Sequence, residues 1–259
     1  MSLSPQSTRT AIVTGAGSGI GQGCATALLK DGWNVVFVGR REQPLTDAID
    51  TACGENQPMK QRAAAMPCDV SDEVAVGKLF DDVAKRFGRV DLLFNNAGVS
   101  LPVHTPDELP ADEWRRAVDI NLNGAFYCLH HAFRVMRAQQ PVGGRIVNNG
   151  SISAHAPRPG SIAYTATKHA VSGLTRAAAL DGRAFDIAVG QIDIGNVASS
   201  MTQRMTKGVP QADGSIKPEA RMELQSVVET FMTMANLPPG ANILFVTVMA
   251  TKMPFVGRG

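Results

Sequence analysis

A run of glycines between a short apolar segment and a helical pattern constrains this fold more than any other feature. Residues 14–21 read TGAGSGIG, follow the apolar run 11–13, and lead into an amphipathic pattern that continues to residue 30. Glycines permit a tight turn and let backbone N–H groups approach a pyrophosphate, and the helix N-terminus favours negative charge. The alternative is an ordinary glycine turn, but the flanking strand and helix favour a dinucleotide site. Its candidate residues are Gly15, Ser18, Gly19, Ile20 and Gly21.

Short apolar runs alternate with longer amphipathic stretches along the chain. The apolar runs predict seven strands, at residues 11–13, 35–38, 63–68, 91–94, 145–148, 186–192 and 243–249. The amphipathic stretches predict helices at 20–30, 44–53, 71–87 with Ser71 as the N-cap, 110–139 and 162–180. This alternation favours an α/β fold, a doubly wound parallel sheet with helices on both faces. No linker or internal repeat is present, so we expect a single domain over residues 1–259.

Composition and charge exclude several classes of protein. Of the 259 residues 44% are hydrophobic, which is unlike a disordered chain, and a net charge of +2 gives no support for nucleic-acid binding. The four cysteines form no C-x-x-C pair, so we expect no metal site. The N-terminus lacks an apolar signal core, and no apolar run is long enough to span a membrane. We therefore expect a cytoplasmic protein with reduced thiols.

The end of the second strand carries Arg40 and Arg41 and has no carboxylate at Gly39. An acid at this point would bind the ribose 2′-hydroxyl of NAD, whereas arginine can pair with the 2′-phosphate of NADP. A solvated pair of surface arginines is the alternative, and Glu42 follows directly. The pattern favours NADP(H), with NAD(H) as the second possibility.

Five further elements follow in order along the chain. They are Asp69 after the third strand, Asn95–Gly98 after the fourth, Asn121 in a long helix, Ser151 after the fifth strand, and Tyr164-x-x-x-Lys168. Together with the glycine loop they resemble the classical short-chain dehydrogenase/reductase family over about residues 8 to 200. The resemblance implies a seven-stranded Rossmann fold. It also implies that the adenine and its ribose contact Asp69, Val70, Asn96, Ala97 and Gly98.

The resemblance implies a catalytic set of Asn121, Ser151, Tyr164 and Lys168. Lys168 lies four residues after Tyr164, so both side chains can share one helical face, and the lysine charge favours a tyrosinate that acts as general base. Ser151 would stabilise charge on the substrate oxygen, and Asn121 would hold a water that connects Lys168 to solvent. Local hydrogen bonding within the helix is the alternative role of Asn121.

These residues predict an NADP(H)-dependent oxidoreductase that interconverts a small-molecule alcohol and a carbonyl. One alternative is a catalytically inactive protein that binds the cofactor in a regulatory role. Another is a lyase or epimerase that uses the same base. The complete set of four residue types argues against the inactive alternative.

The run after the sixth strand departs from the family pattern. Gly195 matches the family's glycine, Ile194 replaces its proline, and Ser199 stands where it has threonine. The resemblance implies cofactor contacts from Gly195, from the main chain of Val197 and from Ser199. Asp193 is an unusual acid at this edge, which either contacts substrate or caps a loop.

The remaining predictions concern mainly the C-terminal part of the chain. Residues 201–219 hold glycines and prolines without clear periodicity, which is typical of a mobile substrate loop, with or without short helices. The apolar residues Phe255 and Val256 should pack on a neighbouring subunit or near the active site. His155 is predicted to border the substrate or to face solvent. The resemblance implies a homotetramer, with a dimer as the alternative, in which helices 110–139 and 162–180 form an interface.

Overall fold

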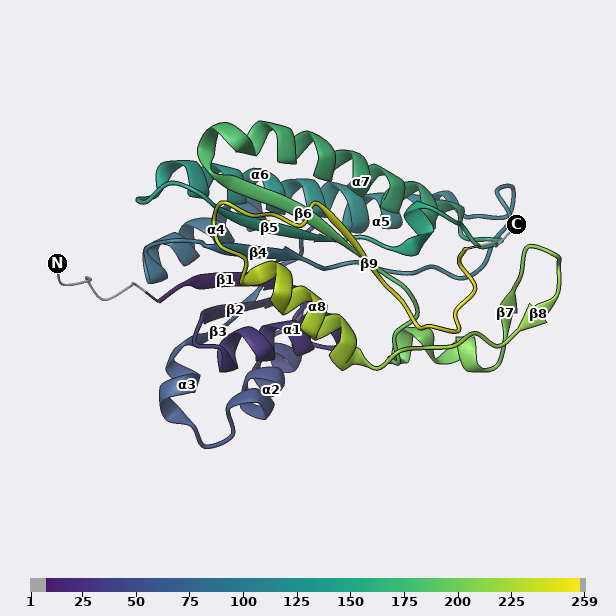
Figure 1. The fold of residues 1–259 in the computed structure, drawn as a ribbon, viewed down its shortest axis with the longest axis horizontal. Helices are drawn as coiled ribbons and strands as arrows, with labels where there is room; N and C mark the ends of the chain where they lie inside the picture. The colour runs from purple at the N-terminus through teal and green to yellow at the C-terminus, as the bar shows by residue number, and fades with distance from the viewer. Residues whose placement is uncertain (1–7, 257–259) are drawn as a thin grey trace.

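A seven-stranded parallel sheet forms the centre of the computed structural model, which describes residues 8–256. Its strand order is β3-β2-β1-β4-β5-β6-β9, the doubly wound Rossmann arrangement that the sequence predicts (Figure 1). The strands are β1 (Thr10–Thr14), β2 (Asn34–Gly39), β3 (Ala63–Pro67), β4 (Leu92–Asn95), β5 (Gly144–Asn149), β6 (Ile187–Ile194) and β9 (Phe245–Val248). The strand order reverses between the central strands β1 and β4. At such a point a crevice opens outside the carboxyl ends of the strands.

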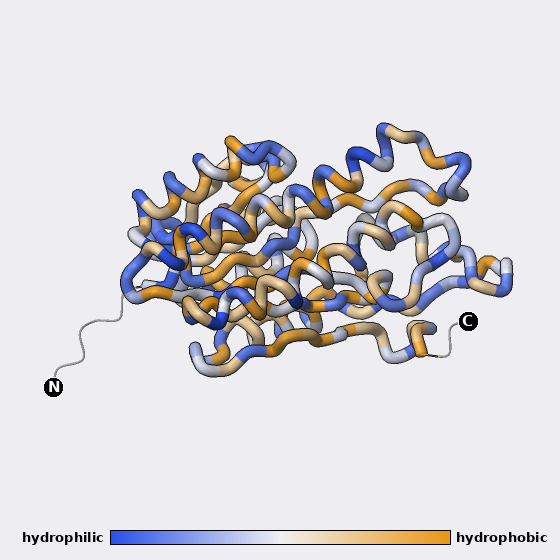
Figure 2. Tube along the Cα trace, turned by 90° about the horizontal axis from the view of Figure 1, so that it is seen from above, coloured by the Kyte–Doolittle hydropathy of each residue, from blue (hydrophilic) through white to orange (hydrophobic). Residues whose placement is uncertain are grey.

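Alternation along the strands builds two hydrophobic cores, one on each face of the sheet. On β1, Ala11 and Val13 join one core and Ile12 joins the other. Because successive side chains of a strand point to opposite faces, a strand buried on both sides must be apolar throughout. Figure 2 shows hydrophobic segments running through the interior and hydrophilic ones along the outer helical turns.

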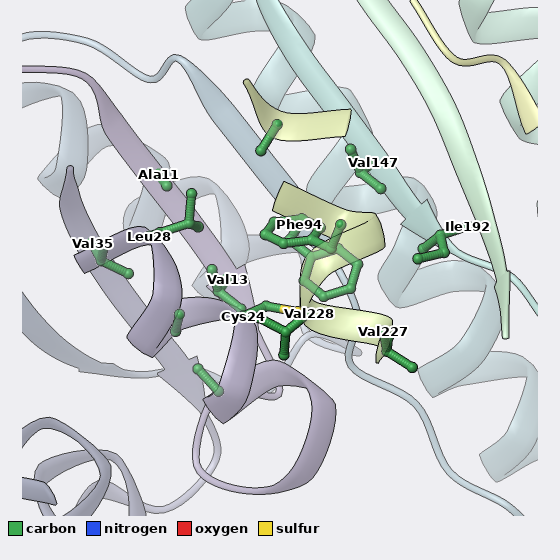
Figure 3. Packing of buried hydrophobic residues seen from close by; sticks show 14 of the residues in the cluster. Ala11, Val13, Cys24, Leu28, Val35, Phe94, Val147, Ile192, Val227 and Val228 are labelled. Carbon is green, nitrogen blue, oxygen red and sulfur yellow. The ribbon is translucent and has the colours of Figure 1, made fainter. Parts of the chain in front are cut away.

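Helices cover both faces of the sheet. One face carries α1 (Gly19–Lys30), α2 (Glu42–Cys53) and α8 (Leu224–Ala235); the other carries α4 (Glu73–Phe87), α5 (Ala111–Val118), α6 (Gly124–Ala138) and α7 (Ile162–Asp181). The short α3 (Gln57–Gln61) leads into β3. Figure 3 shows side chains of α1 and α8 packing onto Val13 and Phe94. Sequence analysis did not predict α8, although its Phe231 lies with its ring centroid 4.3 Å from that of Phe94.

Two helix predictions need correction. The N-cap of α4 is Asp72, whose carboxylate accepts the Ala75 N–H at 3.0 Å. Ser71 instead donates its N–H and its hydroxyl to Asp69 Oδ1, at 3.0 and 2.7 Å, so its side chain is not available as a cap. The predicted helix 110–139 is one helical run, but a π-helical turn, η1 (Asp119–Asn123), separates α5 from α6.

Short elements complete the chain. They are the 3₁₀ helices η2 (Ile152–Ala154), η3 (Gly182–Phe185) and η4 (Ser200–Thr206), and the antiparallel pair β7 (Val209–Pro210) and β8 (Ile216–Lys217). The predicted loop 201–219 is therefore partly regular, with a 3₁₀ helix and a small hairpin. Within residues 8–256, no helix is long and apolar enough to cross a membrane.

Candidate active site

A cavity of about 560 Å³ lies at the carboxyl ends of the central strands, and a smaller one of about 220 Å³ adjoins it. Eighteen of the predicted catalytic and cofactor-binding residues line one or the other. The larger cavity is lined by Gly15, Ser18, Gly19, Ile20, Gly21, Asn96, Ala97, Gly98, Ser151, Tyr164, Lys168, Gly195, Val197 and Ser199. The smaller one adds Arg40, Arg41, Asp69 and Val70 and shares Gly15, Ser18, Ala97 and Gly98. Asn121 lies behind the wall, as described below.

 Tyr164 and Lys168 belong to both predicted sets, the catalytic and the cofactor-binding, and both line the larger cavity.

The glycine loop forms a cradle that fits a dinucleotide. Gly15 and Gly19 have φ angles of +67° and +55°, which other residues rarely adopt. A Cβ on Gly21 would lie 2.2 Å from the Gly15 carbonyl oxygen, so the turn can close only over glycine. A Cβ on Gly19 would meet nothing within 4 Å, which leaves open space at the start of α1. Backbone N–H groups and the helix dipole can therefore face a pyrophosphate there.

Thr14 ties the glycine loop to the segment that follows β4. Its hydroxyl accepts the N–H groups of Asn96 and Ala97, both at 2.9 Å, and its carbonyl accepts Asn96 Nδ2 at 2.8 Å. These bonds hold residues 96–98 beside the glycine turn, on one wall of the larger cavity.

The smaller cavity has basic and acidic residues at its rim. Arg40 and Arg41 are exposed there, and Asp69 and Val70 line the same cavity. Cys68 lies beside them as a free thiol, and burial, with the nearby acids adding to it, raises its pKa to about 11. This thiol therefore stays protonated at neutral pH and is a poor nucleophile. Among the described residues, no group of His, Cys, Asp and Glu is placed to hold a metal ion.

Ser151, Tyr164 and Lys168 converge on the larger cavity. Lys168 is buried, donates from Nζ to the Asn149 carbonyl at 2.7 Å, and lies 5.5 Å from the centroid of the Tyr164 ring. Ser151 Oγ accepts the Ser153 N–H at 3.1 Å, so its own proton remains available to another acceptor. A serine hydroxyl, a phenol and an ammonium therefore line the same cavity as the glycine loop.

Asn121 lies in the π-helical turn η1 rather than in a regular helix. Its amide accepts the Val99 N–H at 2.7 Å, donates to the Val99 carbonyl at 2.9 Å and approaches Thr167 Oγ1 at 3.4 Å. The side chain is buried and fixes the main chain of Val99, which lines the cavity. Single-turn π bulges are frequent at functional sites because the extra residue redirects a side chain.

The segment after β6 holds three residues of the predicted cofactor-binding set. Gly195 packs so tightly that a Cβ would lie 2.8 Å from the Met249 side chain. Val197 pairs with Met222 in an isolated bridge, and the Ser199 N–H donates to Thr202 Oγ1 at 3.2 Å. All three line the cavity.

A buried ion pair ties residues 200–219 to the loop before α7, and sequence analysis did not predict it. The Arg158 guanidinium bonds the Glu219 carboxylate and also donates to Asn196 Oδ1 at 2.8 Å. Asn196 Nδ2 and Gln211 Nε2 donate to the same carboxylate, at 2.7 and 3.1 Å. Arg158 and Asn196 line the cavity, so this cluster forms part of its wall. The sequence feature that could have pointed to this ion pair is the arginine between Ser151 and Tyr164.

The C-terminal tail packs beside the same site. Met253 is buried, and its sulfur accepts the Asn196 N–H at 3.3 Å. Phe255 packs on the hydrophobic core, with its ring centroid 6.3 Å from that of His155. Val256 is 94% exposed, so the prediction that both apolar residues pack holds within this chain for Phe255 alone. The His155 side chain is 40% exposed and pairs with Asp193.

Comparison with known proteins decides the family. The family model for short chain dehydrogenases matches residues 9–210. The chain belongs to the short-chain dehydrogenase/reductase family. It is 37% identical over 201 residues to the 3beta-hydroxysteroid dehydrogenase of Mediterraneibacter gnavus, covering 76% of this chain and 69% of that one. It is 34% identical to the meso-2,3-butanediol dehydrogenase of Serratia marcescens, covering 78% and 75%.

Solved structures agree with this assignment. The levodione reductase crystal structure superposes with a TM-score of 0.82 at 26% identity, covering 93% of this chain and 96% of that one. The short-chain dehydrogenase/reductase described here is therefore an NAD(P)-dependent oxidoreductase that acts on an alcohol or a carbonyl group.

Proposed function

We propose that this enzyme interconverts an alcohol and a carbonyl compound with NADP(H), using Tyr164 as the general acid and base. The observation that carries the proposal is the convergence of Ser151, Tyr164 and Lys168 beside the glycine cradle. A bound nicotinamide cofactor supplies the acceptor or donor of the hydride. In the oxidative direction Tyr164 takes the proton of the substrate hydroxyl, and in the reductive direction it returns one to the carbonyl oxygen.

The neighbouring residues serve this proton transfer. Ser151 donates a hydrogen bond to the substrate oxygen and stabilises the charge that develops there. The Lys168 ammonium favours the ionised phenol, and its bond to the Asn149 carbonyl fixes its position. Asn121 holds a water that links Lys168 to solvent. Its bonds to the Val99 main chain support a rigid position for that water.

A pair of tyrosine variants tests the proposal. The chain has two tyrosines, and Tyr127 lies on α6, so Tyr127→Phe is the matched control for Tyr164→Phe. A panel of neutral alcohols and ketones is assayed by nicotinamide absorbance. We expect Tyr164→Phe to lose at least ~10²-fold in kcat, as removal of a general acid–base does, while the Kd for NADPH stays within about twofold. Retained activity removes Tyr164 from its role. Turnover without a matching absorbance change favours a lyase or epimerase.

The cofactor preference rests on the smaller cavity. Arg40 and Arg41 offer two guanidinium groups there, and Gly39 brings no carboxylate that would repel a phosphate. This chemistry supports NADP(H) over NAD(H). The proposed residue contacts with the cofactor are those of the predicted set, from Gly15 to Ser199.

We further propose a cytoplasmic homo-oligomer, a tetramer or a dimer. Trp114 on α5, Phe126 on α6 and Leu180 on α7 are 39%, 45% and 61% exposed, which supports a helical interface between subunits. The four cysteines are free and buried, in keeping with a reducing compartment. Sedimentation of the purified enzyme tests the assembly, and a monomer at micromolar concentration would contradict it.

A further inference from the structure

Asp193 is a carboxylate buried inside the sheet next to the proposed catalytic serine. It lies on β6, and 1% of the residue is exposed to solvent. A buried carboxylate is costly unless several donors surround it, so its partners reveal what it organises. The sequence left two roles open for Asp193, substrate contact and the capping of a loop. Its burial removes the first, since a residue so enclosed does not contact substrate.

Three donors surround the Asp193 carboxylate. Its Oδ1 atom accepts the Ser151 N–H at 3.0 Å and Gln191 Nε2 at 2.7 Å, and its Oδ2 atom lies 2.9 Å from His155 Nε2. Gln191 is anchored in turn on α7, because Nε2 also donates to Ser172 Oγ at 2.8 Å. The carboxylate therefore links β6, the segment after β5 and α7 through one buried network.

Gly150 makes room for this carboxylate. A Cβ at residue 150 would lie 2.0 Å from Asp193 Oδ1 and 2.5 Å from Gln191 Nε2. Real Cβ atoms essentially never show such contacts, so a side chain immediately before Ser151 would force the Asp193 and Gln191 side chains to shift. The Gly150 N–H also donates to the Ile192 carbonyl at 2.9 Å, which continues the strand pairing up to the serine.

The network sets the direction of the Ser151 hydroxyl. Asp193 holds the Ser151 backbone from one side, and the Ser153 N–H donates to Ser151 Oγ at 3.1 Å from the other. With its oxygen already accepting a bond, Ser151 has its O–H proton left to donate, and the residue lines the cavity. Sub-ångström placement of such a donor decides how well it stabilises a developing charge.

We propose that Asp193 is a positioning residue for Ser151, with His155 as the partner that satisfies its second oxygen. The proposal rests on the proposed oxidoreductase function, because it assigns Ser151 a donor role there. The three residue types of a serine hydrolase triad are present, but their contacts are in the wrong order. The Asp193–His155 pair reaches the serine through the backbone amide instead of through the imidazole and Oγ.

Two substitutions of Asp193 distinguish the effect of its acceptor oxygen from the effect of its negative charge. Asp193→Asn keeps an oxygen for the Ser151 and Gln191 donors, and its amide can donate to a neutral His155. Asp193→Ala removes every acceptor. We expect the alanine variant to lose about 10- to 100-fold in kcat, as when one oxyanion donor is misplaced, with the Kd for NADPH unchanged within about twofold. The asparagine variant should recover kcat to within about threefold of wild type.

A matched control separates positioning from general destabilisation. Asp91 accepts the Thr10 N–H at 2.8 Å and pairs with Arg89, before β4 and far from the carboxyl edge. Asp91→Ala should lower the melting temperature and leave kcat unchanged. If Asp193→Ala lowers only the melting temperature, in the manner of Asp91→Ala, the positioning role is overturned.

Hydrogen exchange of the Ser151 amide provides a readout that needs no turnover. We expect this amide to be protected in the wild type and in Asp193→Asn, and to exchange at least about 10-fold faster in Asp193→Ala. Equal exchange in all three overturns the contact, even if the enzyme is active. Protection that follows the prediction in a protein without nicotinamide-dependent turnover would instead refute the proposed function. If the alanine variant does not fold, a folded asparagine variant that loses both kcat and protection also overturns the proposal.

Discussion

Replacing Glu219 by glutamine tests the Arg158–Glu219 ion pair in the wall of the cavity. The Glu219 side chain is 1% exposed and that of Arg158 is 16% exposed. Glutamine keeps the shape and removes the charge, so the guanidinium remains partly buried without a counter-ion. Breaking a fully buried pair in this way costs ~3–5 kcal/mol, and because water reaches part of Arg158 we expect about 2–3 kcal/mol here.

This cost should appear as local opening of residues 200–219. A loss of about 2–3 kcal/mol corresponds to a ~30- to 150-fold larger population of the open segment. Amide hydrogen exchange of the hairpin β7–β8 should accelerate by that factor, and the KM for substrate should rise. The control is Asp213→Asn, since Asp213 pairs with Lys217 on the same hairpin and both side chains are about 60% exposed. That control should change neither quantity.

Two results would refute the reasoning. One is equal acceleration in Glu219→Gln and Asp213→Asn, which would assign the effect to the hairpin in general. The other is failure of a double variant, Arg158→Met with Glu219→Gln, to recover most of the loss, because removing both charges of a buried pair is often nearly neutral.

The same carboxylate predicts a pH dependence. Burial opposes the ionisation of Glu219, but hydrogen bonds from Arg158, Asn196 and Gln211 outweigh it and hold its pKa below the ordinary value. A lowered folded-state pKa stabilises the closed segment fully above the unfolded-state pKa and loses that contribution as the pH falls through the folded-state value. Exchange of residues 200–219 should therefore accelerate in acid, after correction for intrinsic rates, and Glu219→Gln should abolish this dependence.

Three further predictions concern the cofactor and the tail. Arg40→Ala should raise the Kd for NADPH about 10- to 100-fold, the size of one charge-assisted hydrogen bond, and leave that for NADH within about twofold; equal losses would contradict recognition of the 2′-phosphate. Gly21→Ala should abolish binding of both cofactors in titrations, since its Cβ would lie 2.2 Å from the Gly15 carbonyl oxygen. Removing residues 253–259 should lower the melting temperature and raise the KM, because Met253 is 4% exposed and bonds Asn196. An unchanged melting curve and KM would make the tail incidental.

Local patterns carried the sequence-based prediction of the sheet and the family. The apolar runs of β1, β2 and β4 are buried on both faces, so their composition alone indicates parallel strands. The glycine loop and the Tyr164-x-x-x-Lys168 spacing depend on one turn and one helix, which neighbouring residues determine. These features were predictable because the physics that fixes them is local.

The features that escaped prediction depend on contacts between distant segments. A π turn differs from an α-helix by one residue, and at Asn121 the side chain bonds Val99, twenty-two residues earlier in the chain. The Arg158–Glu219 pair joins residues 61 apart. Asp193 was noticed as unusual, but its link to Ser151 spans 42 residues and needs the fold to be known.

The contact between Gly150 and Asp193 also restricts how this active site can vary. Since a Cβ at residue 150 would lie 2.0 Å from the carboxylate, a side chain there would displace the acid from the position in which it bonds Ser151. A substitution of Gly150 is therefore deleterious while the aspartate is present. The two positions are coupled by sterics, so a change at residue 150 requires a change at residue 193.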